Sequence, residues 1–371
     1  MKKFDKDRLI LGFVGPALAL VSAFLLTMLV LAATGVNPFE PLRIMGENAG
    51  YEDIQVLILN QTGTYYLAAL AVAIGFRMNL FNIGVDGQYR LAAMISAVVG
   101  AAVELPGALH ILLIVLVAML VGAFWSGIAG VLKAKRGVSE VVSTIMLNAI
   151  ATSLIAWLIL PRNLGVQPPG SNDLTTGDIA ESGWFPAVSM GDSGEIYGFT
   201  FVAFALGIVY WFVLNRTRFG FDLRATGASE SAAQASGVDA KKMILTSMLI
   251  SGAVAGLAGM PVLLGETHTY SINFPVGVGF TGITIALLGR NHPVGIFFAA
   301  LLIAFIDKTS AGLDTAGYAK EIGTIMKGLI VIAVVVSYEL VRRYGIRRQQ
   351  QKVGEELAAG HAIKTEKEVA A

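Results

Sequence analysis

Residues 108–132 read ALHILLIVLVAMLVGAFWSGIAGVL and contain no Asp, Glu, Lys or Arg. An α-helix rises about 1.5 Å per residue, so a run of this length spans the hydrocarbon core of a bilayer, which is about 30 Å thick. The whole chain of 371 residues shares this character, with 55% hydrophobic and 14% charged residues, and its mean hydropathy is +0.69. The sequence therefore predicts an integral membrane protein.

On both sides of this run, the same criterion of length and apolar character predicts about ten spans in all. They cover residues 9–33, 54–75, 83–103, 108–132, 139–160, 198–214, 243–264, 270–288, 293–309 and 322–340. Polar residues, Pro and Gly interrupt 83–103 and 270–288. The first run is too long for the apolar core of a signal peptide, so it is expected to remain as a helix. The predicted fold class is all-α, a polytopic transmembrane helical bundle.

The connections rich in Lys and Arg fall on one side of this bundle. They are the N-terminus, Arg77, Lys133–Arg136, Arg216–Lys242, Arg290 and the C-terminal tail. The connections on the other side are acidic or mixed, as in the segment around Glu52 and in residues 161–197. Because positively charged loops are retained in the cytoplasm, this alternation predicts that both termini lie inside the cell.

The predicted organisation is one transmembrane domain over residues 1–345 and a polar cytoplasmic tail over 346–371. The outer loop, residues 161–197, is expected to be solvated, with Trp184 as an aromatic anchor at the membrane surface. In the cytoplasmic segment, residues 215–242, Ser229 is a suitable N-cap and Glu230 would lie in the first turn of a short surface helix.

Two of the predicted spans open with glycine-rich segments, NIGVDGQ at 82–88 and FPVGVGFTG at 274–282. They lie about five spans apart, and an odd number of spans inverts the second unit relative to the first. Interrupted helices at matching positions of inverted halves point to a central transport site. A five-plus-five inverted repeat is therefore one architecture that the pattern allows, and the packing of small residues between helices is the alternative explanation. Such packing accounts fully for Gly252, Gly256 and Gly259.

The sequence contains none of the enzyme motifs that we sought: GxxxxGK[ST], HExxH or GxSxG. Cysteine is absent and the four His residues have no metal-ligand spacing, so no metal site is predicted. The formal net charge of +1 gives no general attraction to nucleic acid. The chain is thus not expected to be an enzyme or to bind a cofactor, and any ATP used would bind another subunit.

Polar residues inside the predicted spans are functional candidates, because such residues are costly in a membrane unless they face a cavity or a partner. They include Asn60, Gln61, Asn82, Asp86, Gln88, Glu140, Ser143, Thr144, Asn148, Thr281, Thr284 and Lys327. Hydrogen bonding between helices is the ordinary role of a single Ser, Thr or Asn.

Three segments together resemble a known family: FNIGVDGQ at 81–88, EVVSTIMLN at 140–148 and GITIALLGRNHPVG at 282–295. They are similar to the permease subunits of bacterial ABC importers for sugars, branched-chain amino acids and nucleosides. The second segment resembles the nucleoside and simple-sugar branch. Residues 225–243 are similar to the cytoplasmic segment that docks on the ATPase in that family. The resemblance covers roughly residues 54–340.

The resemblance implies an ATP-driven importer of ribonucleosides in the bacterial inner membrane. It implies three partners: a second, different permease chain, an ABC ATPase that binds ATP and Mg²⁺, and an extracytoplasmic substrate-binding lipoprotein. The segment that would dock on the ATPase includes Thr226, Gly227, Ser229, Glu230, Ala233 and Gly237. The outer loop could then contact the binding protein.

Amide and hydroxyl groups can bind ribose and base edges, and an aromatic ring can stack on a base. The candidate substrate pathway is Asn82, Gln88, Asn148, Phe274, Phe280, Thr281 and Thr284. Packing or lipid contact is the ordinary role of each Phe. The alternatives are an importer of a simple sugar such as ribose or galactose, an ion-coupled transporter, for which Asp86 and Lys327 would be the charged candidates, and a structural membrane protein.

Overall fold

The computed structural model describes residues 37–319 without a gap. It also describes residues 18, 21–22, 24–33 and 35, and residues 321–334, 336–337, 340–341, 343–345, 347 and 350–351. The described chain falls into two units, one formed by residues 45–312 and the other by residues 1–44 together with 313–371. The basic N-terminus, much of the predicted tail 346–371 and parts of the predicted spans 9–33 and 322–340 lie outside the described residues.

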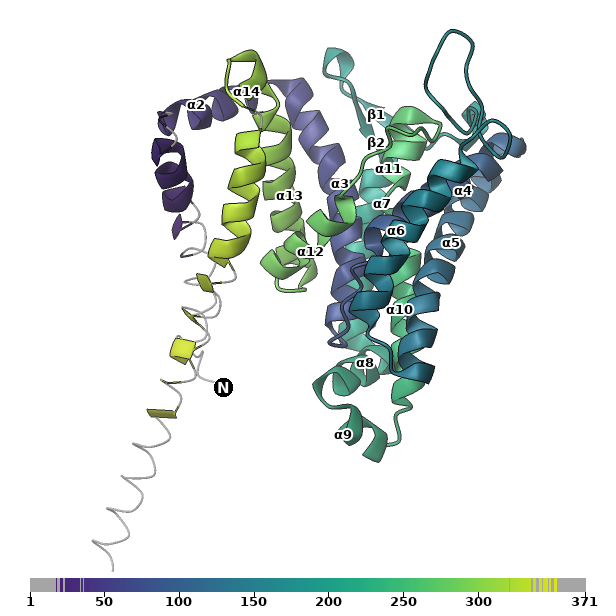
Figure 1. Cartoon of the computed structure of the whole chain (residues 1–371), viewed down its shortest axis with the longest axis vertical. Helices are drawn as coiled ribbons and strands as arrows, with labels where there is room; N and C mark the ends of the chain where they lie inside the picture. Colours follow the sequence, from purple (N-terminus) through teal and green to yellow (C-terminus); the bar gives the residue numbers. More distant parts are fainter. Residues whose placement is uncertain are drawn as a thin grey trace, which may run out of the picture. The chain divides into compact units, whose positions relative to one another are not determined.

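Six helices in the described part of the chain are long and apolar enough to cross a membrane (Figure 1). They are α3 (Glu52–Phe76), α5 (Gly107–Arg136), α6 (Glu140–Leu158), α7 (Gly198–Arg216), α10 (Ala240–Leu257), whose span continues to Thr267, and α13 (Pro293–Ser310). They coincide with six of the predicted spans, and the prediction of a helical membrane protein is confirmed.

Helix α3 lies at the centre of the larger unit. Its residues Leu67 to Ala73 are all buried, and it contacts α7, α10, α12 (Val278–Leu288) and α13. A helix that is apolar on every side buries all of its faces against other helices. Helix α3 thus positions the shorter helices described below.

Helices α5 and α10 pack at very short range through glycines. A Cβ atom on Gly252 would lie 2.3 Å from the carbonyl oxygen of Gly122, and one on Gly256 would lie 2.1 Å from that of Ala118. Such an approach is open only to residues without a side chain. The predicted packing role of Gly252 and Gly256 is therefore confirmed.

Two helices, α4 (Val85–Ala102) and α12, begin after glycine-rich segments. The predicted span 270–288 is wrong at its start, because α12 begins only at Val278. The chain before it passes through α11 (Met260–Val262) and a π-helical turn, η3 (Leu263–Thr267), and then leaves the helix. Pro275 and the left-handed Gly277 (φ +86°) prevent an earlier start, since neither fits a helix interior.

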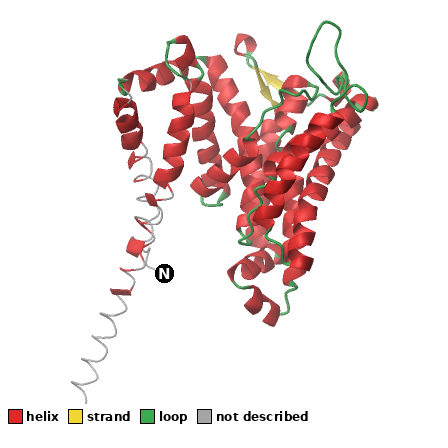
Figure 2. Ribbon diagram, viewed as in Figure 1, coloured by secondary structure: helices red, strands yellow, loops and turns green. Residues whose placement is uncertain are grey.

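The outer loop is mostly exposed, as expected of a solvated loop, and it also has short secondary structure of its own. It contains the short helices η1 (Glu181–Gly183) and η2 (Gly191–Ser193) and the antiparallel strands β1 (Ala187–Ser189) and β2 (Glu195–Tyr197), in yellow in Figure 2. Backbone N–H groups of Thr176, Ile179 and Phe185 donate to carbonyl oxygens of the segment 264–270, at 2.9 to 3.0 Å. The loop is therefore bound to the chain that leads into α12.

The cytoplasmic segment forms two helices, α8 (Arg218–Ala228) and α9 (Glu230–Ala235). The Ser229 hydroxyl accepts the backbone N–H of Ala232 at 3.3 Å, and Glu230 lies in the first turn. The predicted N-cap and short helix are confirmed. In Figure 1, α8 and α9 lie at the end of the larger unit opposite to β1 and β2.

The basic and acidic connections of the larger unit gather at these opposite ends. At the end with α8, the Arg77 guanidinium donates to the carbonyl oxygen of Asn291 at 2.6 Å. At the other end, Ser193 donates to a Glu52 carboxylate oxygen at 2.9 Å. This grouping agrees with the alternation of charge along the sequence.

The second unit includes helical residues 24–33 and 321–334, which fall inside two predicted spans. The hydroxyls of Ser22 and Ser337 lie 3.3 Å apart and bring the two segments together. Helices α2 (Phe39–Asn48) and α14 (Gly312–Thr315) cross the two sequence boundaries between the units.

Candidate functional site: a junction of two helix N-termini

The first turns of α4 and α12 meet, and we call residues 82–90 and 274–281 together the helix junction. A Cβ atom on Gly279 would lie 2.3 Å from the backbone nitrogen of Asp86. The two broken segments found in the sequence therefore touch, although Asp86 and Gly279 are far apart along the chain. A helix N-terminus carries unsatisfied N–H groups and a partial positive charge, so two of them in contact need an acceptor.

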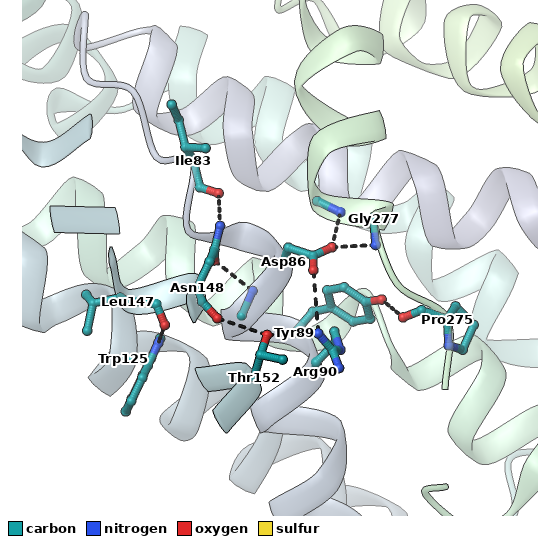
Figure 3. Close-up of polar contacts among 12 residues, drawn as sticks. Ile83, Asp86, Tyr89, Arg90, Trp125, Leu147, Asn148, Thr152, Pro275 and Gly277 are labelled. Carbon is teal, nitrogen blue, oxygen red and sulfur yellow. Dashed lines mark hydrogen bonds and ion pairs between the residues drawn. The ribbon is translucent and has the colours of Figure 1, made fainter. Parts of the chain in front are cut away.

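Asp86 provides this acceptor (Figure 3). Its Oδ1 accepts the backbone N–H groups of Gly277 at 2.8 Å and Gly279 at 3.2 Å. The neighbouring Tyr89 donates its hydroxyl to the carbonyl oxygen of Pro275. Two side chains of α4 thus bind the start of α12.

Arg90 lies one turn further along α4 and faces the same carboxylate. Its guanidinium is 3.9 Å from Asp86 Oδ2, and the two side chains are only 10% and 7% exposed. It also donates to the hydroxyl of Thr152 at 3.2 Å. Its Nε is buried without a hydrogen-bond partner among the described residues. An ion pair inside a membrane span is a functional candidate.

Asn148 of α6 binds the start of α4 with both ends of its amide. Its oxygen accepts the backbone N–H of Gly87, and its nitrogen donates to the carbonyl oxygen of Ile83, both at 2.9 Å. Helix α6 is itself tied to α5, since the Trp125 indole donates to the Leu147 carbonyl at 3.3 Å. Asn148 of α6 therefore holds the start of the neighbouring helix α4, as Figure 3 shows.

Asn82 and Gln88 form a closed pair inside the junction. The Asn82 amide donates to Gln88 Oε1 at 3.0 Å and the Gln88 amide donates back to Asn82 Oδ1 at 2.8 Å. Asn82 also donates to Ser251 and accepts from the Gly84 N–H. The two side chains are buried, and their hydrogen bonds hold the non-helical turn in place.

The remaining pathway candidates lie on or next to α12. Phe274 is buried and stacks on Tyr270, with ring centroids 4.8 Å apart. Thr281 donates to the carbonyl oxygen of Gly277 at 3.1 Å. Phe280 is 51% exposed and Thr284 is partly exposed, and residues four apart share one face of a helix. Phe280, Thr281 and Thr284 of α12 are at least partly exposed, as is Asn148 of α6. Asn82, Gln88 and Phe274 are buried.

Four residues of this region were not among the pathway candidates from the sequence, namely Tyr65, Tyr89, Arg90 and Asp307. Tyr65 of α3 donates its hydroxyl to the Asp307 carboxylate of α13. The available signal was the charge itself, since Arg90 and Asp307 both lie inside predicted spans. Asp86 carried the same signal and was named as a polar candidate and as a charged candidate for ion coupling, but not as a pathway residue.

The residues expected to dock on the ATPase lie around a groove of about 760 Å³ between α8, α9 and the start of α10. Ser229, Ala233 and Gly237 line it, and Glu230 is exposed beside it. Thr226 is buried instead. Gly227 is not a flexible flank, because it lies inside α8.

Gly227 packs on the turn that follows α3. A Cβ atom there would lie 2.6 Å from the carbonyl oxygen of Arg77. Arg77 and Tyr210 both donate to the carbonyl oxygen of Asn291, at 2.6 and 2.9 Å, just after α12. The chain of contacts therefore leads from α8 to the C-terminal end of α12.

The electrostatics outside the spans are most distinctive at His268, which follows η3 in a left-handed conformation (φ +52°). Its ring stacks on Trp184 of the outer loop, with centroids 3.9 Å apart. Burial lowers the pKa of His268 below its ordinary value, and the charge of Glu195 opposes this shift. Within the described ranges, no group of three or more His, Cys, Asp or Glu side chains is placed to hold a metal ion.

The long apolar helices and the two broken helices that meet inside them define a polytopic membrane protein of the transport type. The sequence matches the family of the branched-chain amino acid transport system permease component over residues 54–335, and the chain belongs to this family.

Three relatives illustrate its range. The chain is 36% identical over 292 residues to the guanosine ABC transporter permease protein NupP of Bacillus subtilis, covering 76% of this chain and 81% of the relative. It is 30% identical over 341 residues to the nucleoside ABC transporter permease protein NupB of Lactococcus lactis, covering 87% and 90%. It is 28% identical over 352 residues to a glucose ABC transporter permease protein of Haloferax volcanii, covering 91% and 90%.

The family consists of transport subunits and not of catalytic ones, and the chain is a multi-pass protein of the inner membrane. As an ABC permease, it works within a system that also contains an ATPase and a substrate-binding protein.

Proposed function

We propose that this chain is the permease subunit of an ATP-driven importer of nucleosides. The observation that carries the proposal is the 36% and 30% identity to permeases named for guanosine and for nucleosides, over most of both chains. The glucose permease is less similar, at 28%. An importer of a simple sugar is therefore the second candidate.

In this proposal the solute passes along the exposed face of α12, where Phe280 can stack on a base and Thr284 can bind a ribose hydroxyl. Thr281 lies one position after Phe280. The other predicted pathway residues act mainly by holding the helix junction, since Asn82, Gln88 and Asn148 already use their amides in the contacts described above.

The proposed topology has about ten spans in one domain, residues 1–345, with both termini inside and a five-plus-five inverted repeat. The contact between the N-termini of α4 and α12 supports the repeat, because the broken helices of inverted halves meet at a central site in transporters of this kind. A second, different permease chain would complete the pore.

The ATPase would bind at the groove between α8 and α9, and ATP and Mg²⁺ would be held by that subunit, with no cofactor on this chain. A movement of α8 would reach α12 through Gly227, Arg77 and Asn291, which are in contact. The binding protein, expected to be a lipoprotein, would contact the folded outer loop.

Uptake into liposomes that contain the chain, its partner permease, the ATPase and the binding protein tests the proposal. We expect labelled guanosine to accumulate only with internal ATP, to persist with an uncoupler present, and to be displaced by other nucleosides. Accumulation of ribose or glucose without guanosine would establish the sugar importer. Uptake that needs no ATP and stops with the uncoupler would establish an ion-coupled transporter.

The docking groove has its own test. Ala232→Trp places a large ring in the groove, and Glu230→Lys reverses an exposed charge beside it, so both should release the ATPase from purified membranes. Ser189→Trp, on the exposed strand β1, is the matched control. Co-purification of the ATPase with both groove variants at the level of the control would exclude docking there.

A further inference from the structure

Helix α12 has no capping side chain of its own. Its N-cap residue is Gly277, in a left-handed conformation, and no cap hydrogen bond comes from within the segment. A helix start inside a membrane needs its free N–H groups satisfied, because no water is available to bind them. In this chain the acceptor comes from another helix, through Asp86 Oδ1.

The charge of this acceptor suits its place. A carboxylate binds backbone N–H groups about twice as strongly as a neutral acceptor does. Asp86 faces the start of α12 and lies itself in the first turn of α4, and a negative charge is favourable at both helix N-termini. Arg90, 3.9 Å away, adds a positive charge on the other side.

The two helices differ in how firmly they are held. Helix α4 is fixed by the Asn148 amide and by the Asn82–Gln88 pair. Helix α12 has only 11 residues and is bound at its start by Asp86 and Tyr89. The start of α4 is therefore held by more side-chain hydrogen bonds, and Asp86 satisfies the free N–H groups at the start that Pro275 and Gly277 give to α12.

We propose that Asp86 is a positioning residue for transport: its carboxylate caps α12 from α4 and so holds the exposed face of α12 toward the solute pathway. This inference rests on the proposed function. Asp86 does not touch the solute in this role. It acts through α12.

The chain contains no cysteine, so a single introduced cysteine can carry a spin label on this chain, which is labelled before the importer is assembled. We choose Val276, an exposed residue of the junction (67% exposed), as the label position and Leu112 on α5, which is 52% exposed, as the reference position. Each label is measured in Asp86→Asn, in Asp86→Ala and in Glu104→Gln, which changes an exposed carboxylate at the end of α4 and serves as control.

We expect Asp86→Ala to make the label at Val276 more mobile and to leave the label at Leu112 unchanged. Uptake should fall about tenfold, the effect of losing a charge-assisted hydrogen bond, while ATP hydrolysis continues. Asp86→Asn keeps an oxygen that can accept both N–H groups but removes the charge, so the label should be less mobile than in Asp86→Ala and uptake should recover in part. Glu104→Gln should behave as the parent.

Gly279→Ala tests the same contact if Asp86→Ala does not reach the membrane. The added Cβ would lie 2.3 Å from the Asp86 nitrogen, so it should displace α12 and mobilise the label at Val276 with Asp86 intact. Parental mobility in Gly279→Ala and in Asp86→Ala, with parental uptake, would overturn the proposal. The label is read without solute, so a responsive label in a chain that moves no nucleoside would refute the proposed function and leave the cap standing.

Discussion

Asn148→Leu tests whether the Asn148 amide, which binds the start of α4, stabilises the fold or contacts the solute. Leu has the same branching and the same number of side-chain heavy atoms as Asn, although it is bulkier, and it cannot form hydrogen bonds. The N–H of Gly87 and the carbonyl of Ile83 would therefore each lose a partner now at 2.9 Å. A buried backbone group left without a partner costs about 1–3 kcal/mol. Gly87 is buried and Ile83 is half-buried, so we expect a loss of about 2–4 kcal/mol in the free energy of unfolding.

The assay is thermal unfolding of the purified chain in detergent, followed by uptake. At about 2.1 cal/mol/K of unfolding entropy per residue, a loss of this size lowers the midpoint by about 3–5 °C in a chain of 371 residues. Asn148→Asp keeps the acceptor for Gly87 and loses the donor to Ile83. Its midpoint should lie between those of the parent and of Asn148→Leu. Met146→Leu, on the exposed side of the same helix, is the control. An unchanged midpoint with abolished uptake would refute the clamp and make Asn148 a solute contact.

Three further predictions follow from single contacts. Gly227→Val should push α8 away from the turn at Arg77 and lower uptake severalfold at a normal rate of ATP hydrolysis. An unchanged ratio of uptake to ATP hydrolysis would exclude transmission from α8 to α12 through this contact. Gly252→Ala places a Cβ atom 2.3 Å from a carbonyl oxygen of α5, so it should lower the thermal midpoint of the chain. Gly237→Ala places its Cβ atom in open space but at φ +83°, so it should disturb only α9 and leave the midpoint unchanged. Burial lowers the pKa of His268. The neutral His268 side chain therefore contributes to the free energy of unfolding above pH about 6.5. This contribution is lost as the pH falls, since the unfolded chain then binds more protons. The midpoint should therefore drop less between pH 7.5 and 5.5 in His268→Phe, which keeps the stack and cannot titrate; an equal drop in both would contradict this.

Much of the candidate site was visible in the sequence as residues but not as contacts. The glycine-rich starts of α4 and α12 stand out because Gly and Pro interrupt apolar runs. The amides of Asn82, Gln88 and Asn148 stand out because polar groups are rare inside spans. Asn148 binds backbone atoms, which every residue carries, and Asn82 and Gln88 bind each other. No sequence pattern therefore distinguishes these structural contacts from a solute contact.

The outer loop shows the same limit. Its Gly, Pro and Ser residues indicate a loop, and the structure agrees that it joins α6 to α7. Its hydrogen bonds to residues 264–270 use backbone groups, and they depend on where η3 ends. Amino-acid composition therefore does not predict which backbone groups of the loop pair with residues 264–270.

The sequence by itself determined the membrane architecture, because a run such as 108–132 must cross a bilayer whatever its neighbours are. It also determined the family, since three separated segments resemble those of known permeases. Only the tertiary structure decided that Asp86 caps α12, 191 residues further along the chain. Hydropathy is a local property that each residue carries alone, whereas a cap across two helices exists only once packing has brought their ends together.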